Sequence, residues 1–195
     1  MQVLEYITRR FNGVVGSNFI KVKSNSIELI FPNNAYSDYS VIANLLAKLA
    51  SSFKNIDKKY VDPEDKHNHA SVKLDKGEDQ IVIKITGALY IPSTKFLKLY
   101  NMILWYLIRY RTGTKPGDSE EGRKLVNEWK FEEKQLKHEI NRLPRRQISS
   151  YEKRLCHICG EETNLLNIWK FTTGNSNIGT DIETAVCVKH ASRLI

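Results

Sequence analysis

Cysteine is scarce in this sequence, because the 195 residues include only 3 and all three lie at or after position 156. A long apolar run is missing as well. The most apolar segment, residues 94–111, is interrupted by Lys98, Asn101 and Arg109 before it reaches the roughly 20 apolar residues of a membrane span. The first residues also lack the basic flank and apolar stretch of a signal peptide. We therefore expect no membrane association and no secretion, and a cytoplasmic location, or a nuclear one in a eukaryote.

The composition that is present is that of a folded protein with a basic character. Hydrophobic residues make up 41% of the chain and charged residues 27%, which excludes a disordered class. The length suffices for one core and a small metal module. The formal net charge of +8 indicates a polyanionic partner, with nucleic acid first and an acidic membrane surface second.

All three cysteines fall in one motif. Cys156 and Cys159 form a CxxC pair, and Cys187 and His190 form a CxxH pair after a long gap. Two cysteines at this spacing fit a tight knuckle, and a Cys and a His three residues apart share one face of a helix. Gly160 follows the second cysteine, where a knuckle needs a residue that tolerates positive φ. The motif predicts one structural Zn²⁺ with these four ligands.

The motif has two other interpretations. A redox CxxC or a disulfide stays open, but a redox dithiol would need a strand before it and a helix after it, whereas Glu161–Asn164 is typical of a turn. A catalytic zinc keeps one position free for water, and four ligands are already available here. Between Cys159 and Cys187 there is no histidine to serve a nuclease.

The order of parts around the motif resembles a treble-clef zinc finger. The knuckle is followed by an expected strand over 165–171, with Trp169 and Phe171, and then by a polar, glycine-containing loop over 172–180. A terminal helix carrying the last ligand would complete the finger. The resemblance covers only the C-terminal part of the chain and implies a shape, not an activity.

The rest of the chain predicts an α+β fold. Residues 2–11 have helical apolar spacing, and Gly13 and Gly16 are expected to end that helix. The remaining elements follow from apolar spacing, caps and turn residues, and comprise β-hairpins over about 19–31 and 71–86 and helices over about 37–55, 94–111 and 119–143. We expect two domains, an α+β body over 1–150 and a zinc-finger module over 151–195.

Most of the positive charge lies between residues 93 and 155, which hold 15 Lys and Arg against 8 Asp and Glu. One group crowds the connector before the knuckle and another the end of the 94–111 helix. Such groups can neutralise phosphates, although a solvated basic linker without a ligand is the alternative. The expected nucleic-acid-binding residues are Arg142, Arg145, Arg146, Lys153, Arg154, Arg109, Arg111 and Lys115.

These observations favour a non-enzymatic protein that binds DNA or RNA. We expect it to be a subunit of a larger nucleoprotein complex of the phage, mobile-element, transcription or CRISPR type, with protein partners. One alternative is a metal-dependent nuclease, and its candidate residues are Asp62, Glu64, Asp65, His67 and His69. The other is a protein–protein adaptor that binds through helix 94–111 or the apolar stripe of 119–143.

Overall fold

The computed structural model describes residues 2–23, 26–34, 38–60, 71–86, 93–141, 145–147, 154–156, 159–172 and 179–191. Its helices are α1 (Gln2–Val15), α2 (Tyr39–Tyr60), α3 (Ser93–Thr112), α4 (Glu120–Asn141) and the short α5 (Val188–Ala191). Its strands are β1 (Ile20–Lys23), β2 (Ser26–Pro32), β3 (Ser71–Lys76), β4 (Gln80–Thr86), β5 (Arg145–Gln147), β6 (Arg154–Leu155), β7 (Glu162–Thr163), β8 (Leu165–Thr172) and β9 (Gly179–Ala185). The expected α+β class is confirmed.

Two hairpins build the main sheet. The strand order is β1-β2-β4-β3 and every neighbouring pair is antiparallel. The central seam joins β2 to β4, with Leu29 opposite Ile83 and Ile27 opposite Ile85. Both expected hairpins are therefore present, and the seam between them joins segments far apart in the sequence.

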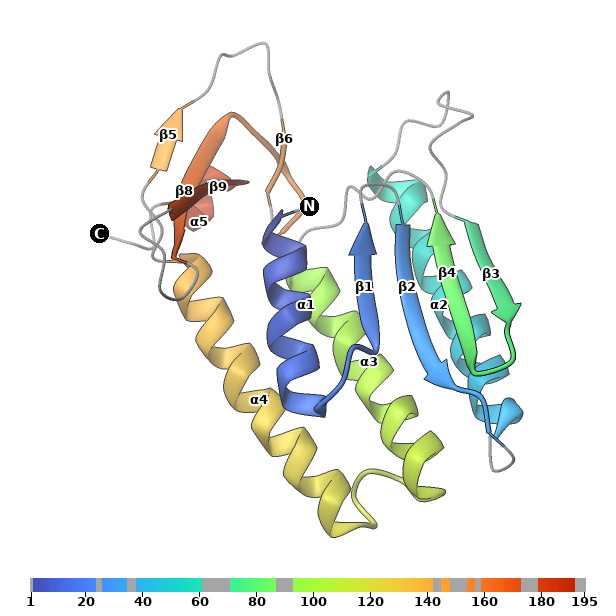
Figure 1. Ribbon diagram of the computed structural model, residues 1–195. Coiled ribbons are helices and arrows are strands. Elements are labelled where there is room, and N and C mark those ends of the chain that lie inside the picture. Colours follow the sequence, from blue (N-terminus) through green and yellow to red (C-terminus); the bar gives the residue numbers. More distant parts are fainter. Residues whose placement is uncertain are drawn as a thin grey trace.

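The two faces of this sheet differ in chemistry. On the core face, Ile27, Leu29, Ile81, Ile83 and Ile85 are all buried. In Figure 1, β4 and β3 lie in front of α2, and α1 lies beside β1. The opposite face, called the outer face below, is carried by the alternate residues Lys21, Lys23, Ser26, Glu28, Ile30, Ser71, Lys73, Asp75, Val82, Lys84 and Thr86.

Helix α1 is longer than its sequence suggests. It runs through Gly13 and ends at Val15, before Gly16, whose φ of 78° lies in the left-handed region. The expectation that Gly13 would end the helix was wrong. Phe11 and Val15 on either side of it are buried in the core, and this packing outweighs the roughly 1 kcal/mol that a helical glycine costs.

The third layer is α4, which packs on α1 and α3. Its Trp129 is buried, stacks edge-on against Phe11 with ring centroids 5.1 Å apart, and donates its indole N–H to Asn101 Oδ1 at 2.6 Å. Leu136 of the same stripe is fully buried. Where the structure describes it, the stripe expected on 119–143 packs in or against the core.

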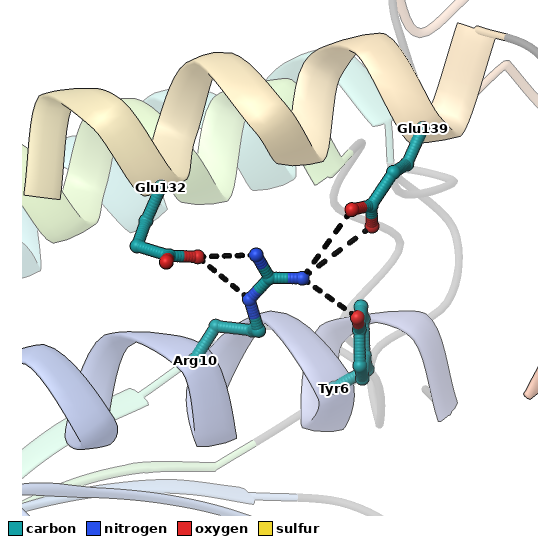
Figure 2. Close-up of polar contacts among 4 residues, drawn as sticks. All are labelled: Tyr6, Arg10, Glu132 and Glu139. Carbon is teal, nitrogen blue, oxygen red and sulfur yellow. Dashed lines mark hydrogen bonds and ion pairs between the residues drawn. The ribbon is translucent and has the colours of Figure 1, made fainter. Parts of the chain in front are cut away.

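An ion cluster fastens the outer edge of α1 to α4. Figure 2 shows the Arg10 guanidinium between Glu132 and Glu139, with Tyr6 beside it. Arg10 Nε donates to Glu132 Oε2 at 2.7 Å and Nη1 donates to the Tyr6 hydroxyl at 2.8 Å, while Glu139 lies 3.5 Å away. Burial lowers the pKa of Arg10, but the bonds to Tyr6 and Glu132 outweigh it and the pKa rises above its usual value. The cluster therefore holds a permanent charge at this helix contact.

The C-terminal strands form two further small sheets. One has the order β5-β8-β9 and the other pairs β6 with β7. Residues 144–154 were expected to be a connector, yet Arg145–Gln147 form β5 and pair with 165–167 of β8. Gly179 and Thr180, expected in a loop, belong to β9. The domain boundary at residue 150 stays a prediction.

Among the described residues, no helix combines the length and the apolarity that a bilayer crossing requires.

Candidate metal centre

The knuckle is the turn of the β6–β7 hairpin. Cys156 follows β6 directly, and its N–H donates to Glu161 O at 2.7 Å. The N–H of Gly160 donates back to Cys156 O at 2.8 Å, and Gly160 has a φ of 79°. The positive φ expected at this glycine is confirmed. These two bonds curl the backbone so that the second cysteine, Cys159, returns towards the first.

Thr163 joins the knuckle to the segment after β9 that carries the third cysteine. Its hydroxyl is buried and donates to Val186 O at 2.7 Å, and it accepts the N–H of Leu165 at 3.1 Å. Val186 N–H in turn donates to Leu165 O at 2.9 Å. Since Val186 directly precedes Cys187, this network fixes the register in which Cys187 meets the knuckle.

The three cysteines converge on one point. The Sγ atoms of Cys156, Cys159 and Cys187 all lie within 4.8 Å of one another, and those of Cys159 and Cys187 are 3.6 Å apart. All three are free thiols; Cys156 and Cys187 are buried and Cys159 is partly so. Thiolates at this spacing are the donor set that zinc and other soft metals prefer. The cluster can hold a metal ion.

The protonation state of the cluster depends on that ion. Burial, together with the neighbouring sulfurs, raises the pKa of Cys159 to about 12 when no cation is present. A bound cation reverses this balance, because metal ligation deprotonates thiols and releases their protons. Metal binding and thiol ionisation are therefore one coupled event here.

An ion pair spans the outside of the cluster. Lys189 Nζ on α5 lies 3.0 Å from Glu161 Oε1 in the knuckle. Each group changes the pKa of the other. The hydrogen bond and charge of Lys189 lower the pKa of Glu161, and those of Glu161 raise the pKa of Lys189. Both side chains are exposed, so the pair contributes little stability but links the same two segments as Thr163.

The expected fourth ligand, His190, lies on α5, three residues after Cys187. Its side chain is outside the described part of the chain, as is all of His157. His190 as a ligand stays a prediction.

The expected nucleic-acid-binding residues fall into two separate groups. Arg109, Arg111 and Lys115 lie at or beyond the end of α3, while β5 and β6 lie near the opposite end of α4 in Figure 1. The 22 residues of α4 separate the groups by about 33 Å. Within the described part of the chain, these two groups are not brought together.

The members of these groups differ in what surrounds them. Arg111 is ion-paired with Glu121 at 2.8 Å, and Arg109 lies over the Trp105 ring at 5.6 Å from its centroid. Arg154 on β6 and Lys115 are exposed. The others lie outside the part that can be described, namely Arg142, Lys153 and the side chains of Arg145 and Arg146. The nuclease candidates in 62–69 also lie outside it.

Sequence reasoning missed the residues that position the cluster. Thr163 follows an ordinary turn, and only the structure shows that its hydroxyl bonds both Leu165 at the start of β8 and Val186 after β9. Glu161 and Lys189 are 28 positions apart, and no local pattern pairs them. Comparisons of this chain with protein-family models, with curated proteins and with solved structures found no match.

Proposed function

We propose that the cysteine cluster is a structural zinc site of a treble-clef-like finger. The convergence of three thiols on one point supports this, and His190 is placed in sequence to supply the fourth ligand from α5. The role is structural because four protein ligands leave no position for water or substrate. Zinc would supply folding free energy that strands as short as β6 and β7 cannot obtain from their own contacts.

We further propose that the whole chain is a non-enzymatic nucleic-acid-binding subunit of a larger complex, and that it works in a reducing compartment such as the cytoplasm. The net charge of +8 supports a polyanionic partner. Arg145 and Arg146 lie on β5 and Arg154 lies on β6, before the metal cluster in sequence, and Arg154 is exposed. The finger would fix the backbone that carries these arginines.

The zinc assignment is tested by metal analysis and by cobalt substitution. The purified chain should bind one zinc per molecule, and Co²⁺ should give the visible bands of a tetrahedral site with sulfur-to-cobalt charge transfer. His190→Ala should keep the charge-transfer bands and change the visible ones, whereas Cys159→Ser should weaken both. Lys124→Ala on α4 is a surface control. Octahedral cobalt, or no bound metal, would contradict the assignment.

The nucleic-acid proposal is tested by salt titration. Labelled single- and double-stranded DNA and RNA should bind with an affinity that falls steeply as salt rises. A variant with Arg145, Arg146, Lys153 and Arg154 changed to Ala should bind more weakly and with a shallower salt dependence. If the wild-type chain binds none of these at low salt, the nucleic-acid proposal fails.

A second candidate function, the adaptor, is favoured by one observation on α1 and α4. Phe131 is 62% exposed and lines a groove of about 750 Å³ with Gly13 and Val14. A Cβ added at Gly13 would meet nothing within 4 Å, so a projecting ring lies beside an open hollow. The partner that this arrangement would favour is a second copy of this chain, in a two-fold contact where the ring of each copy enters the hollow of the other.

This candidate has its own test. It predicts a dimer in sedimentation experiments that Phe131→Ser converts to monomer, together with no salt-sensitive binding to nucleic acid. A wild-type chain that sediments as a monomer at high concentration would exclude it. The surface of α3 is not available for this role where its apolar residues Phe96, Leu97, Tyr100, Leu104 and Leu107 are buried.

A further inference from the structure

Two lysines face each other on the outer face of the sheet. Lys73 on β3 and Lys84 on β4 are register partners. Residues directly opposite in an antiparallel pair have Cβ atoms about 5 Å apart, and like charges at such positions destabilise a sheet. Among the described residues, no acidic side chain forms an ion pair with either lysine. The fold therefore keeps two positive charges together at a cost.

The nearest acids do not remove this charge. Glu28 is the other register neighbour of Lys84, but it pairs with Lys23 at 2.8 Å. Asp75 is two residues from Lys73 on the same face, opposite Val82. Counting the whole face, Lys21, Lys23, Lys73 and Lys84 stand against Glu28 and Asp75, which leaves a positive surplus.

Hydroxyl groups lie beside the lysine pair. Ser71 and Thr86 form the next cross-strand pair on this face, and their hydroxyl oxygens are 2.7 Å apart. One hydroxyl donates to the other, so the second proton remains free to donate to an anion. Two ammonium groups and one spare hydroxyl donor on adjoining pairs suit the oxygens of a phosphate group.

An apolar strip lies on the other side of the lysine pair. Ile30 and Val82 are register partners on the outer face and both are half-buried. A stacked duplex presents its charged sugar–phosphate backbone outward, which does not match an apolar strip. The unstacked bases of a single strand, by contrast, expose apolar faces that can contact these two side chains while the backbone follows the lysines.

We infer that the outer face of the main sheet binds single-stranded nucleic acid, with Lys73 and Lys84 holding phosphates beside Ser71 and Thr86 and with bases over Ile30 and Val82. The inference deepens the proposed nucleic-acid function and rests on it. It adds the outer face of the sheet as a second contact surface beside the basic connector. A phosphate bound there would also relieve the repulsion between the two lysines.

The test compares salt titrations of two double variants on fluorescent single-stranded DNA and RNA. Lys73→Gln/Lys84→Gln should reduce the slope of log K against log salt by roughly 1.4, since each lost contact on a single strand contributes about 0.7. That corresponds to an affinity loss on the order of 20-fold at about 0.1 M salt. The matched control is Lys48→Gln/Lys54→Gln, which removes the same charge from exposed positions on α2 and should lose much less.

A stability measurement separates binding from folding. Lys73→Glu converts the repulsive pair into an attractive one, so it should melt no earlier than the wild-type chain and still bind more weakly. This combination supports a ligand-binding role, whereas a variant that melts earlier and binds normally would overturn it.

The remaining outcomes distinguish the two proposals. If the wild-type chain binds single strands and the Lys73/Lys84 variant matches the control variant, the inference is wrong and the connector remains the contact. If the wild-type chain binds no nucleic acid, both proposals fail. Binding to vesicles containing phosphatidylserine, without binding to oligonucleotides, would assign the lysines to a membrane surface and overturn the inference. An equal loss of duplex binding would overturn its single-strand part.

Discussion

The hydroxyl of Thr163 donates a hydrogen bond of 2.7 Å to the carbonyl of Val186. This bond holds the knuckle with Cys156 and Cys159 in register with the segment that carries Cys187. Thr163→Val keeps the shape but leaves a buried carbonyl and the N–H of Leu165 without this partner. We expect a loss of about 1–3 kcal/mol in unfolding free energy and weaker zinc binding. Thermal melting and competition with a chromogenic chelator measure the two effects. Thr163→Ser keeps the hydroxyl and should behave nearly as wild type; equal losses in both variants would contradict the role of the bond.

Removing the metal should unfold one part of the chain. With a strong chelator, we expect amide hydrogen exchange to accelerate in 154–163 and 185–189 while β2 and β4 keep their protection. The proposed zinc ion would supply the folding free energy of the first region, whereas apolar burial supplies that of the second. Cys156→Ala should reproduce the effect without chelator. Loss of protection throughout the chain would mean that the finger and the body unfold together.

Arg10 should contribute to the stability of the fold. Arg10→Met leaves Glu132 and Glu139 facing each other without a cation, and since all three side chains are only 26–38% exposed we expect a loss of about 1–2 kcal/mol. Urea unfolding measures it. Adding Glu132→Gln to Arg10→Met should restore part of the loss, and strictly additive losses would show that the two residues do not interact.

Asp38 caps α2, and its charge makes that cap sensitive to acid. Its Oδ1 accepts the hydroxyl of Ser40 at 2.6 Å and the N–H of Ser40 at 3.0 Å. The bond from the Ser40 hydroxyl, aided by backbone N–H groups, lowers the pKa of Asp38 below its ordinary value of 3.8. Because the folded-state pKa is depressed, this stabilisation is fully present above about pH 4 and is lost as the pH falls through the lower value.

The corresponding measurement is a series of melting curves from about pH 6 to about pH 2. Asp38→Asn keeps an acceptor for the cap and removes the titration, so its melting temperature should fall less steeply in acid than that of the wild type. Asp38→Ala should be destabilised across the whole range, since the cap is gone. Parallel curves for the wild type and Asp38→Asn would refute the assignment.

Gly122 is required by a close approach between α4 and the loop before it. A Cβ at this position would lie 2.6 Å from Pro116 O and 3.1 Å from Ile108 Cγ2. Gly122→Ala should therefore cost about 1–3 kcal/mol in chemical denaturation, despite the better helix propensity of alanine. Gly13→Ala is the matched control: it also sits in a helix, its Cβ would meet open space, and it should stabilise the chain by up to about 1 kcal/mol.

The helices and strands of the body could be predicted from the sequence, because each depends on the spacing of apolar residues within its own segment. Ile81, Ile83 and Ile85 recur at every second position, between Val82, Lys84 and Thr86, and this alternation marks β4. The apolar spacing of α2 and α3 marks two core helices. What could not be read is the pairing of β2 with β4, because alternation shows which side of a strand is apolar but not which strand lies beside it.

The convergence of the three cysteines was predictable from the sequence, but the residues that position them were not. The CxxC spacing, with Cys187 in a CxxH, is typical of metal-ligand pairs, and these three thiols do meet at one point. The strand formed by Arg145–Gln147 has no apolar alternation and forms by pairing with β8, so the local sequence did not predict it. Likewise, Lys73 and Lys84 become a pair only through the register of their hairpin.

The sheet order has a consequence for how fast the chain folds. Each hairpin joins neighbouring segments and can form early, on the microsecond timescale typical of hairpins. The seam between β2 and β4, by contrast, requires a loop that includes all of α2 to close first. Docking of two preformed hairpins onto that helix is then the expected slow step. Substitutions along the seam, such as Leu29→Ala, should slow refolding more than those in the turn at Gly77.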